Sequence, residues 1–165
     1  MLFQGEEWGS RSRFQFFTDY ADEGIGKAVD EGRKREFASH DWEKIYDGEV
    51  EVPSPQALST FLNSKLLWQE LSEVEHKKML AWYRHLIALR REGVFADFIS
   101  LERQNRLLVL KTEHAQVIVN LHHRSANTSD LVAQLPQGDY ISFTNGKLEN
   151  PPAEILGEDT LLIVG

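Results

Sequence analysis

The sequence predicts an α+β protein of 165 residues, in which a helical first part precedes a small antiparallel β-sandwich domain. Three observations predict this division. Helical apolar spacing is confined to residues 1–95. Short apolar or alternating runs separated by polar turns follow one another through residues 96–165, which is typical of an antiparallel sandwich or meander. Val, Ile and Thr, which favour strands, number 14 of 70 residues in the second part and 10 of 95 in the first.

The first part begins with a segment that indicates a strand and then a loop. Residues 1–3 are apolar and stop shortly before Gly5, which suggests a short strand. A loop rich in aromatic side chains follows, and residues 22–38 then carry apolar side chains at partly helical spacing among many charges. We therefore expect a first helix over 22–38.

Two further helices are predicted before the β domain. The prolines at 53 and 55 indicate a turn, and Ser54 or Ser59 would cap the helix that follows it. The apolar face of that helix would consist of Leu58, Phe61, Leu62 and Leu66. Residues 74–91 carry the strongest helical stripe of the chain, and Gly93 is expected to end that helix.

The second part is predicted to contain five or six short strands. Asn145-Gly146 is typical of a two-residue hairpin turn, which requires a positive φ at both residues. The expected strands cover residues 98–101, 107–111, 116–121, 140–144 and 160–164.

Composition excludes several classes of function. The chain carries 18 Lys and Arg against 26 Asp and Glu, a net charge of −8, which argues against nucleic acid or an anionic membrane as partner. The absence of Cys excludes disulfides, Cys-ligated metals and a thiol nucleophile. No apolar run reaches the roughly 18 residues of a membrane span, and no signal peptide is evident. We therefore expect a soluble cytoplasmic protein.

Two carboxylates near the N-terminus are the first candidates for chemistry. Glu6 and Glu7 are neighbours, so in an extended segment they point to opposite faces and cannot flank one scissile bond. One of the two could point into a site while the other braces the structure, although a simpler interpretation is that both are solvated acids in a loop.

His122 and His123 are also neighbours, so their side chains are expected to diverge in a strand. We therefore expect both histidines to lie at the surface end of a strand, and we predict no metal site there.

Aromatic side chains gather in the loop after these carboxylates. Rings stack on the apolar C–H faces of sugars, and the carboxylates of Glu7 and Asp19 could accept hydrogen bonds from sugar hydroxyls. Packing of the loop on a core is an equally good explanation of the rings alone. The rings are those of Trp8, Phe14, Phe16, Phe17 and Tyr20.

Two motifs in this region resemble a known enzyme family. Gly5-Glu6-Glu7-Trp8-Gly9, followed by Phe16-Phe17-Thr18-Asp19, is similar to the segment at the eighth barrel strand of malto-oligosyltrehalose trehalohydrolases, members of the alpha-amylase family. Further similar stretches run in order to residue 91, including Tyr83-Arg84-His85-Leu86. The β-rich part resembles the C-terminal domain of the family by position and pattern only.

The resemblance implies a fold and a division into domains. Residues 1–95 would be the end of a catalytic (β/α)₈ barrel, namely its last strand, an aromatic loop and closing helices. Residues 96–165 would be the C-terminal antiparallel β domain. A complete barrel needs about 250 residues, so 165 residues are expected to be a C-terminal fragment.

The resemblance also implies an activity for the full enzyme. Such enzymes hydrolyse the α-1,4-glucosidic bond next to a terminal trehalose unit and release trehalose, with retention and without a cofactor. The catalytic carboxylates of the family would precede Met1, so no residue here is expected to be catalytic, and the fragment alone is expected to be inactive. Its partners would be a maltooligosaccharide or trehalose-type sugar and the missing N-terminal barrel portion. The expected substrate-binding residues are Glu7, Trp8, Phe16, Phe17 and Asp19.

Two alternatives stay open on the sequence. The chain could be a non-catalytic carbohydrate-binding or interaction module, or a fragment of another alpha-amylase relative such as a branching enzyme. Tyr20 stands where the family usually has His, which leaves the contact at that position open.

Overall fold

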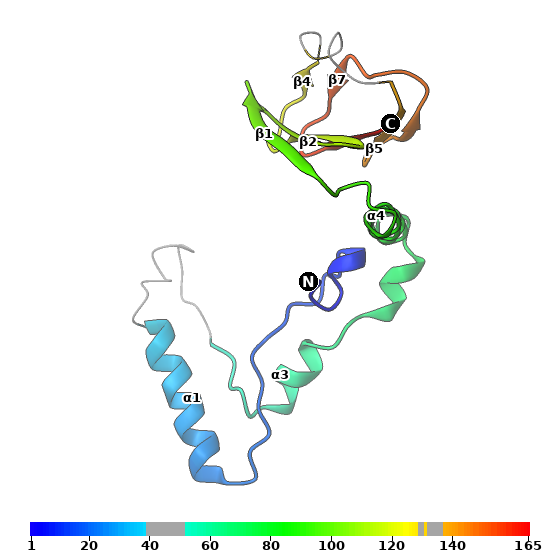
Figure 1. Cartoon of the computed structure of the whole chain (residues 1–165). Helices are drawn as coiled ribbons and strands as arrows, with labels where there is room; N and C mark the ends of the chain where they lie inside the picture. The colour runs from blue at the N-terminus through cyan, green and yellow to red at the C-terminus, as the bar shows by residue number, and fades with distance from the viewer. Residues whose placement is uncertain (39–51, 129–130, 132–136) are drawn as a thin grey trace. The chain divides into compact units, whose positions relative to one another are not determined.

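A computed structural model describes residues 1–38, 52–128, 131 and 137–165 (Figure 1). The chain divides into two compact units, Met1–Leu80 and Ala81–Gly165. Within the described ranges, no helix is both long and apolar enough to cross a membrane.

The first unit contains short helical elements joined by extended segments. In chain order these are η1 (Glu6–Trp8), α1 (Glu23–Ala38), α3 (Leu58–Asn63), η2 (Trp68–Ser72) and the start of α4 (Val74–Arg91). The strand predicted over residues 1–3 is wrong. The carbonyl of Phe3 accepts from the N–H of Glu6 at 3.1 Å, and the N–H of Phe3 donates to the Glu6 carboxylate at 2.9 Å. These backbone groups are satisfied locally because no strand lies beside them in the described chain.

The helix predicted over 22–38 is present, and its start has a side-chain cap. Asp22 Oδ1 accepts the N–H of Ile25 at 3.1 Å, and the Asp22 carbonyl accepts the N–H of Gly26 at 3.0 Å. The carboxylate therefore satisfies one of the backbone donors that a helix N-terminus leaves open.

The helix predicted after the prolines is shorter than expected and is capped differently. α3 begins after Ala57 with no side-chain cap, so the prediction of Ser54 or Ser59 as the cap is wrong. The Ser54 carbonyl instead accepts the hydroxyl of Thr60 at 2.6 Å, and Thr60 is the buried residue of the helix. Three members of the expected apolar face are exposed, namely Leu58, Phe61 and Leu62.

The longest helix has the predicted bounds and the predicted end. Gly93, at φ 81°, donates to the Arg90 carbonyl at 3.2 Å, and the Val94 N–H donates to the Leu89 carbonyl at 3.0 Å. This hydrogen-bond pair is a Schellman motif, in which glycine takes the left-handed position. Val94 and Leu89 belong to the same buried cluster and complete the motif with an apolar contact.

The second unit is built on a six-stranded antiparallel sheet with the order β1-β2-β3-β8-β5-β6 and a separate two-stranded sheet of β4 and β7. The antiparallel β domain is therefore present, with a second layer of only two short strands. The strands are β1 (Phe98–Gln104), β2 (Leu107–Thr112), β3 (Ala115–Asn120), β4 (Ala126–Asn127), β5 (Asp139–Ser142), β6 (Gly146–Leu148), β7 (Glu154–Ile155) and β8 (Thr160–Val164).

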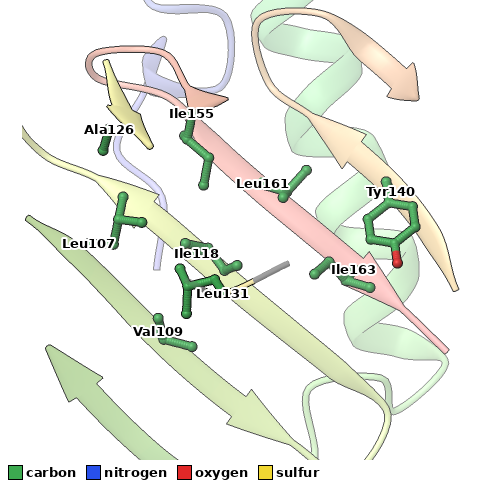
Figure 2. Close-up of a cluster of buried hydrophobic side chains, with 9 residues drawn as sticks. All are labelled: Leu107, Val109, Ile118, Ala126, Leu131, Tyr140, Ile155, Leu161 and Ile163. Carbon is green, nitrogen blue, oxygen red and sulfur yellow. The ribbon is translucent and has the colours of Figure 1, made fainter. Parts of the chain in front are cut away.

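Both faces of the large sheet carry apolar clusters. Leu161 and Ile163 of β8 belong to the cluster that includes β4 and β7 (Figure 2). Leu162, between them, belongs to a second cluster with Leu89 of α4 and Val94. Because successive strand residues point to opposite faces, a strand buried on both faces must be apolar throughout. The first cluster comprises Leu107, Val109, Ile118, Ala126, Leu131, Tyr140, Ile155, Leu161 and Ile163.

The predicted hairpin at Asn145-Gly146 is present, but its turn is longer than expected. Ser142 pairs with Gly146, so three residues form the turn, and Gly146, at φ 76°, is the residue with positive φ. The prediction of a two-residue turn with two positive φ values is wrong. The Asn145 N–H donates to the Ser142 hydroxyl at 3.0 Å, which favours the longer turn with a left-handed glycine.

The buried carboxylate of Asp159 fastens this hairpin to β8. Its oxygens accept the Ser142 hydroxyl at 2.7 Å, the Thr144 N–H at 3.0 Å and the Thr160 N–H at 2.8 Å. We expect Asp159→Asn to lower the free energy of unfolding by about 1–3 kcal/mol, since hydrogen bonds to a buried charged acceptor are lost. Urea unfolding followed by circular dichroism measures this change.

Asp139→Asn is the matched control for that substitution. Asp139 also lies on β5, but its ion pair with Lys147 is exposed on both sides, so we expect a change below about 1 kcal/mol. Equal losses for the two variants would contradict the role of Asp159.

Candidate functional site

The N-terminal motif folds into a tight turn that depends on two glycines. Gly5 and Gly9 have φ values of 81° and 65°, and the Ser10 N–H donates to the Gly5 carbonyl at 2.8 Å. A Cβ at Gly5 would also lie 2.7 Å from Leu66 Cδ2. Glycine is therefore required at position 5 both by the backbone conformation and by the close packing.

The turn buries the indole of Trp8. Only 3% of Trp8 is exposed, and its ring packs on that of Trp68 with the centroids 5.3 Å apart. Its Nε1–H donates to Glu70 Oε2 at 3.4 Å. Trp8 thus anchors the turn from inside the first unit.

Glu70 is the hydrogen-bond acceptor around which this region is organised. Glu70 is 4% exposed, and its carboxylate also accepts the Ser10 hydroxyl at 2.9 Å and the Arg11 N–H at 3.2 Å. Burial raises the pKa of the Glu70 carboxyl. Hydrogen bonds from Ser10, Arg11 and Trp8, together with nearby His76, outweigh burial, so the pKa lies below its ordinary value.

A buried histidine holds the same turn through its backbone. His76 Nδ1 lies 2.7 Å from the Trp8 carbonyl, so Nδ1 carries the proton and donates it. His76 is 4% exposed, and its Nε2 lies 3.7 Å from Glu73 Oε2. Side chains from η2 and α4 therefore fix both the indole and the carbonyl of Trp8.

The segment after the turn is extended, and two side chains from the 55–64 region hold it. The Ser64 hydroxyl accepts the Gln15 N–H at 2.9 Å and donates to the Gln15 carbonyl at 3.2 Å. Gln56 holds Tyr20 in the same way, since its Oε1 accepts the Tyr20 N–H and its Nε2 donates to the Tyr20 carbonyl, both at 3.1 Å. Gln56 Oε1 also accepts the Thr18 hydroxyl at 2.6 Å. These side chains supply the hydrogen bonds that a neighbouring strand would otherwise provide.

A row of exposed aromatic rings runs along this segment. Phe3 contacts Phe14, Phe14 contacts Phe17, and Phe17 contacts Phe61 of α3, with centroid separations of 5.4, 5.9 and 5.1 Å. All four rings are at least 37% exposed. We call Phe3, Phe14, Phe17 and Phe61 the aromatic row. Next to its Phe3 end lies an open cavity of about 360 Å³ that Phe3, Phe14 and Leu66 help to line.

The five residues predicted to bind sugar lie in different surroundings. Trp8 is buried, and Glu7 in the turn is half-buried. Phe17 belongs to the aromatic row, whereas Phe16 lies under the Arg33 guanidinium, 5.0 Å from its ring centroid. Asp19 is exposed and lies between Thr18 and Tyr20, whose backbones are held at Pro55 and Gln56.

Comparison with known proteins identifies the family. A Rhizobium sp. malto-oligosyltrehalose trehalohydrolase is 35% identical over 161 residues, which is 92% of this chain and 26% of that protein. The enzyme of the same name from Mycobacterium tuberculosis is 37% identical over 73% of this chain and 21% of its own length. That from Deinococcus radiodurans is 52% identical over 56% of this chain and 14% of its length. The chain belongs to the malto-oligosyltrehalose trehalohydrolase family.

The chain spans about a quarter or less of these trehalohydrolases, which fits the predicted C-terminal portion. A crystal structure of a "Putative alpha Amylase from Salmonella typhimurium" superimposes with a TM-score of 0.69 over 98% of this chain and 27% of that one, at 24% identity. This likeness shows that the chain shares the fold of one part of that protein. No family model matches the sequence.

The side chains that support the turn and the extended segment of this trehalohydrolase chain could not be predicted from the sequence. Glu70, His76, Gln56 and Ser64 hold the turn or the extended segment, yet none stands out by spacing or motif. Glu70 is one of 26 acidic residues in the chain, and its partners at 8, 10 and 11 are about 60 positions away. The aromatic cluster was the available signal for the region.

The lowered pKa of Glu70 predicts a pH-dependent stability. A carboxyl whose pKa falls on folding stabilises the protein above its ordinary pKa, which is 4.5 here, and that contribution is lost as the pH falls through the folded-state pKa. We expect Glu70→Gln to lower the melting temperature at pH 7, and the difference from the unsubstituted chain to shrink steadily below pH 4.5. Thermal melts between pH 3 and pH 7 measure this. Glu92→Gln, at an exposed position after α4, is the control, and the prediction fails if its profile matches that of Glu70→Gln.

Proposed function

We propose that this chain is the C-terminal portion of an enzyme that hydrolyses the α-1,4-glucosidic bond next to a terminal trehalose unit and releases trehalose. Within that enzyme, residues 1–95 would be the end of the catalytic barrel and residues 96–165 the C-terminal β domain. The observation that carries the proposal is that the family's motif residues form an anchored turn and loop with exposed rings and carboxylates.

Bond cleavage by a glycosidase requires a suitably placed pair of carboxyl groups, and Glu70, the buried carboxylate of this region, does not suit that role. A retaining glycosidase uses two carboxyl groups about 5–5.5 Å apart, one of which must stay protonated as the general acid and so needs a raised pKa. Glu70 is buried, but its pKa is lowered, and its oxygens accept three hydrogen bonds within the protein. Glu70 therefore suits a structural role, and the catalytic pair would come from the rest of the enzyme.

The aromatic loop would shape the sugar-binding end of the cleft. Phe16 and Phe17 supply apolar surface for the C–H faces of glucose rings, and Asp19 and Glu7 supply acceptors for their hydroxyls. Trp8, being buried, would act by holding Glu7 and the turn in place. Anchoring at Gln56 and Ser64 lowers the entropy that the loop would lose on binding a sugar.

The chain by itself is expected to release no trehalose. Maltooligosyl trehalose is incubated with the purified chain, and trehalose is measured by chromatography. Because a site without an acid and a nucleophile lacks both catalytic steps, we expect the rate of the buffer control. The positive control is the chain co-expressed with the part of the Rhizobium sp. trehalohydrolase that precedes the matched 161 residues. Trehalose release by the chain alone would contradict the proposal.

Substitutions in the loop are expected to weaken sugar binding in that co-expressed complex. Asp19→Asn should raise KM for maltooligosyl trehalose about tenfold, since a charged hydrogen bond contributes roughly 1.5–3 kcal/mol, while folding is unaffected because Asp19 is exposed. Asp22→Asn is the control, because asparagine caps a helix as well as aspartate does. Steady-state kinetics distinguish the two variants, and an unchanged KM for Asp19→Asn would remove that residue from the site.

A further inference from the structure

A cavity of about 390 Å³ lies at one end of the large sheet, at the turn between β1 and β2 and beside β4. It is on the face that carries the first apolar cluster, since Leu107, Ala126 and Leu131 of that cluster line it (Figure 2). Its volume is within the range of roughly 300–1,000 Å³ that is typical of small-molecule sites. We call it the Arg106 cavity. Its polar lining consists of Gln104, Asn105, Arg106, Ser125 and Asn127.

Every polar side chain among these described lining residues can donate a hydrogen bond, and none is acidic. Together they supply one guanidinium, three amides and one hydroxyl. The carboxylate of Glu102 on β1 is not part of the lining, and it accepts the Ser100 hydroxyl at 3.1 Å and the Gln104 amide at 3.5 Å. The described lining therefore favours a ligand that is rich in hydrogen-bond acceptors.

The end of the sheet around the Arg106 cavity is positively charged, although the chain has a net charge of −8. Residues 103–106 and 122–125 include three arginines and two histidines but no acidic residue. The Arg106 guanidinium makes no ion pair or hydrogen bond with another residue in the described part of the chain. Burial lowers the pKa of His122, and the charges of His123 and Arg106 lower it further, which reflects a positive local field.

We propose that the Arg106 cavity binds a phosphate group, either on a small metabolite or as free phosphate. The planar guanidinium of Arg106 can form two parallel hydrogen bonds with such a group. A phosphate offers at least three acceptor oxygens, which suits this set of donors better than the two oxygens of a carboxylate do. The net charge of −8 disfavours a polyanion such as RNA or DNA. The site belongs to the β domain and does not depend on the proposed trehalose-releasing activity.

Amide NMR spectra of the isotope-labelled full chain locate the site. Inorganic phosphate and glucose 6-phosphate are each added at constant ionic strength set with sodium chloride, and glucose and acetate serve as the neutral and carboxylate controls. We expect saturable shifts at residues 104–107 and 125–127 with at least one of the two phosphates, at a Kd of about 1 mM or tighter. Glucose and acetate should leave these signals unchanged.

Two matched variants separate the cavity from the net charge of the chain. Arg106 is exposed, so we expect Arg106→Gln to keep the fold and to weaken phosphate binding at least about tenfold, because the charged fork is lost. Arg91→Gln removes the same charge from an exposed position at the end of α4, outside the cavity. We expect this control to change the Kd by less than about twofold.

The two phosphates also distinguish the source of the group. A Kd at least about tenfold lower for glucose 6-phosphate assigns the cavity to a phosphorylated metabolite, and any smaller difference assigns it to free phosphate. The proposal is wrong if neither phosphate causes a saturable shift, or if acetate or glucose shifts the same signals as strongly. It is also wrong if Arg106→Gln binds phosphate as the unsubstituted chain does. Equal losses for Arg106→Gln and Arg91→Gln would overturn it too, since net charge alone would then explain the binding.

Discussion

The carboxylate of Glu70 is the contact on which the arrangement of the N-terminal unit depends. It lies on η2, yet its three donors come from the turn at residues 8–11. A buried ionised carboxylate is stable only when its lone pairs are satisfied, so the turn and η2 must fold together. His76 adds a second connection, through the carbonyl of Trp8, to the same turn. The loop that carries Phe16 to Asp19 follows directly after this anchored turn.

The β unit depends on a different constraint, the burial of the large sheet on both faces. β8 lies in the centre of the sheet, and its alternate residues Leu161 and Leu162 belong to two different clusters. One cluster is closed by the two-stranded sheet and the other by α4. Because α4 is a single helix and the sheet has six strands, its cover ends before β1. The exposure of Leu101 on β1 follows from this mismatch in width.

Much of the fold could be predicted from local pattern. The bounds of α4 and its end at Gly93 follow from an apolar stripe and a glycine. Alternation and turn residues likewise predict β1, β2, β3, β5 and β8, but not the short strands β4, β6 and β7. The wrong predictions also have local causes. The segment at residues 1–3 has strand composition but no neighbouring strand in the described chain, and the hairpin at Gly146 takes a longer turn because Ser142 offers its hydroxyl.

The sequence by itself determined the family, through the Gly5–Gly9 and Phe16–Asp19 motifs, and the succession of a helical part and an antiparallel β part. These properties depend on residues that are neighbours along the chain. Only the tertiary structure decided that Trp8 is buried, that Glu70 and Gln56 hold the loop, and that Leu101 of β1 is exposed while Leu162 of β8 is buried. Those properties depend on residues tens of positions apart meeting in space. Hydrophobic periodicity carries no information about which distant partner a side chain meets.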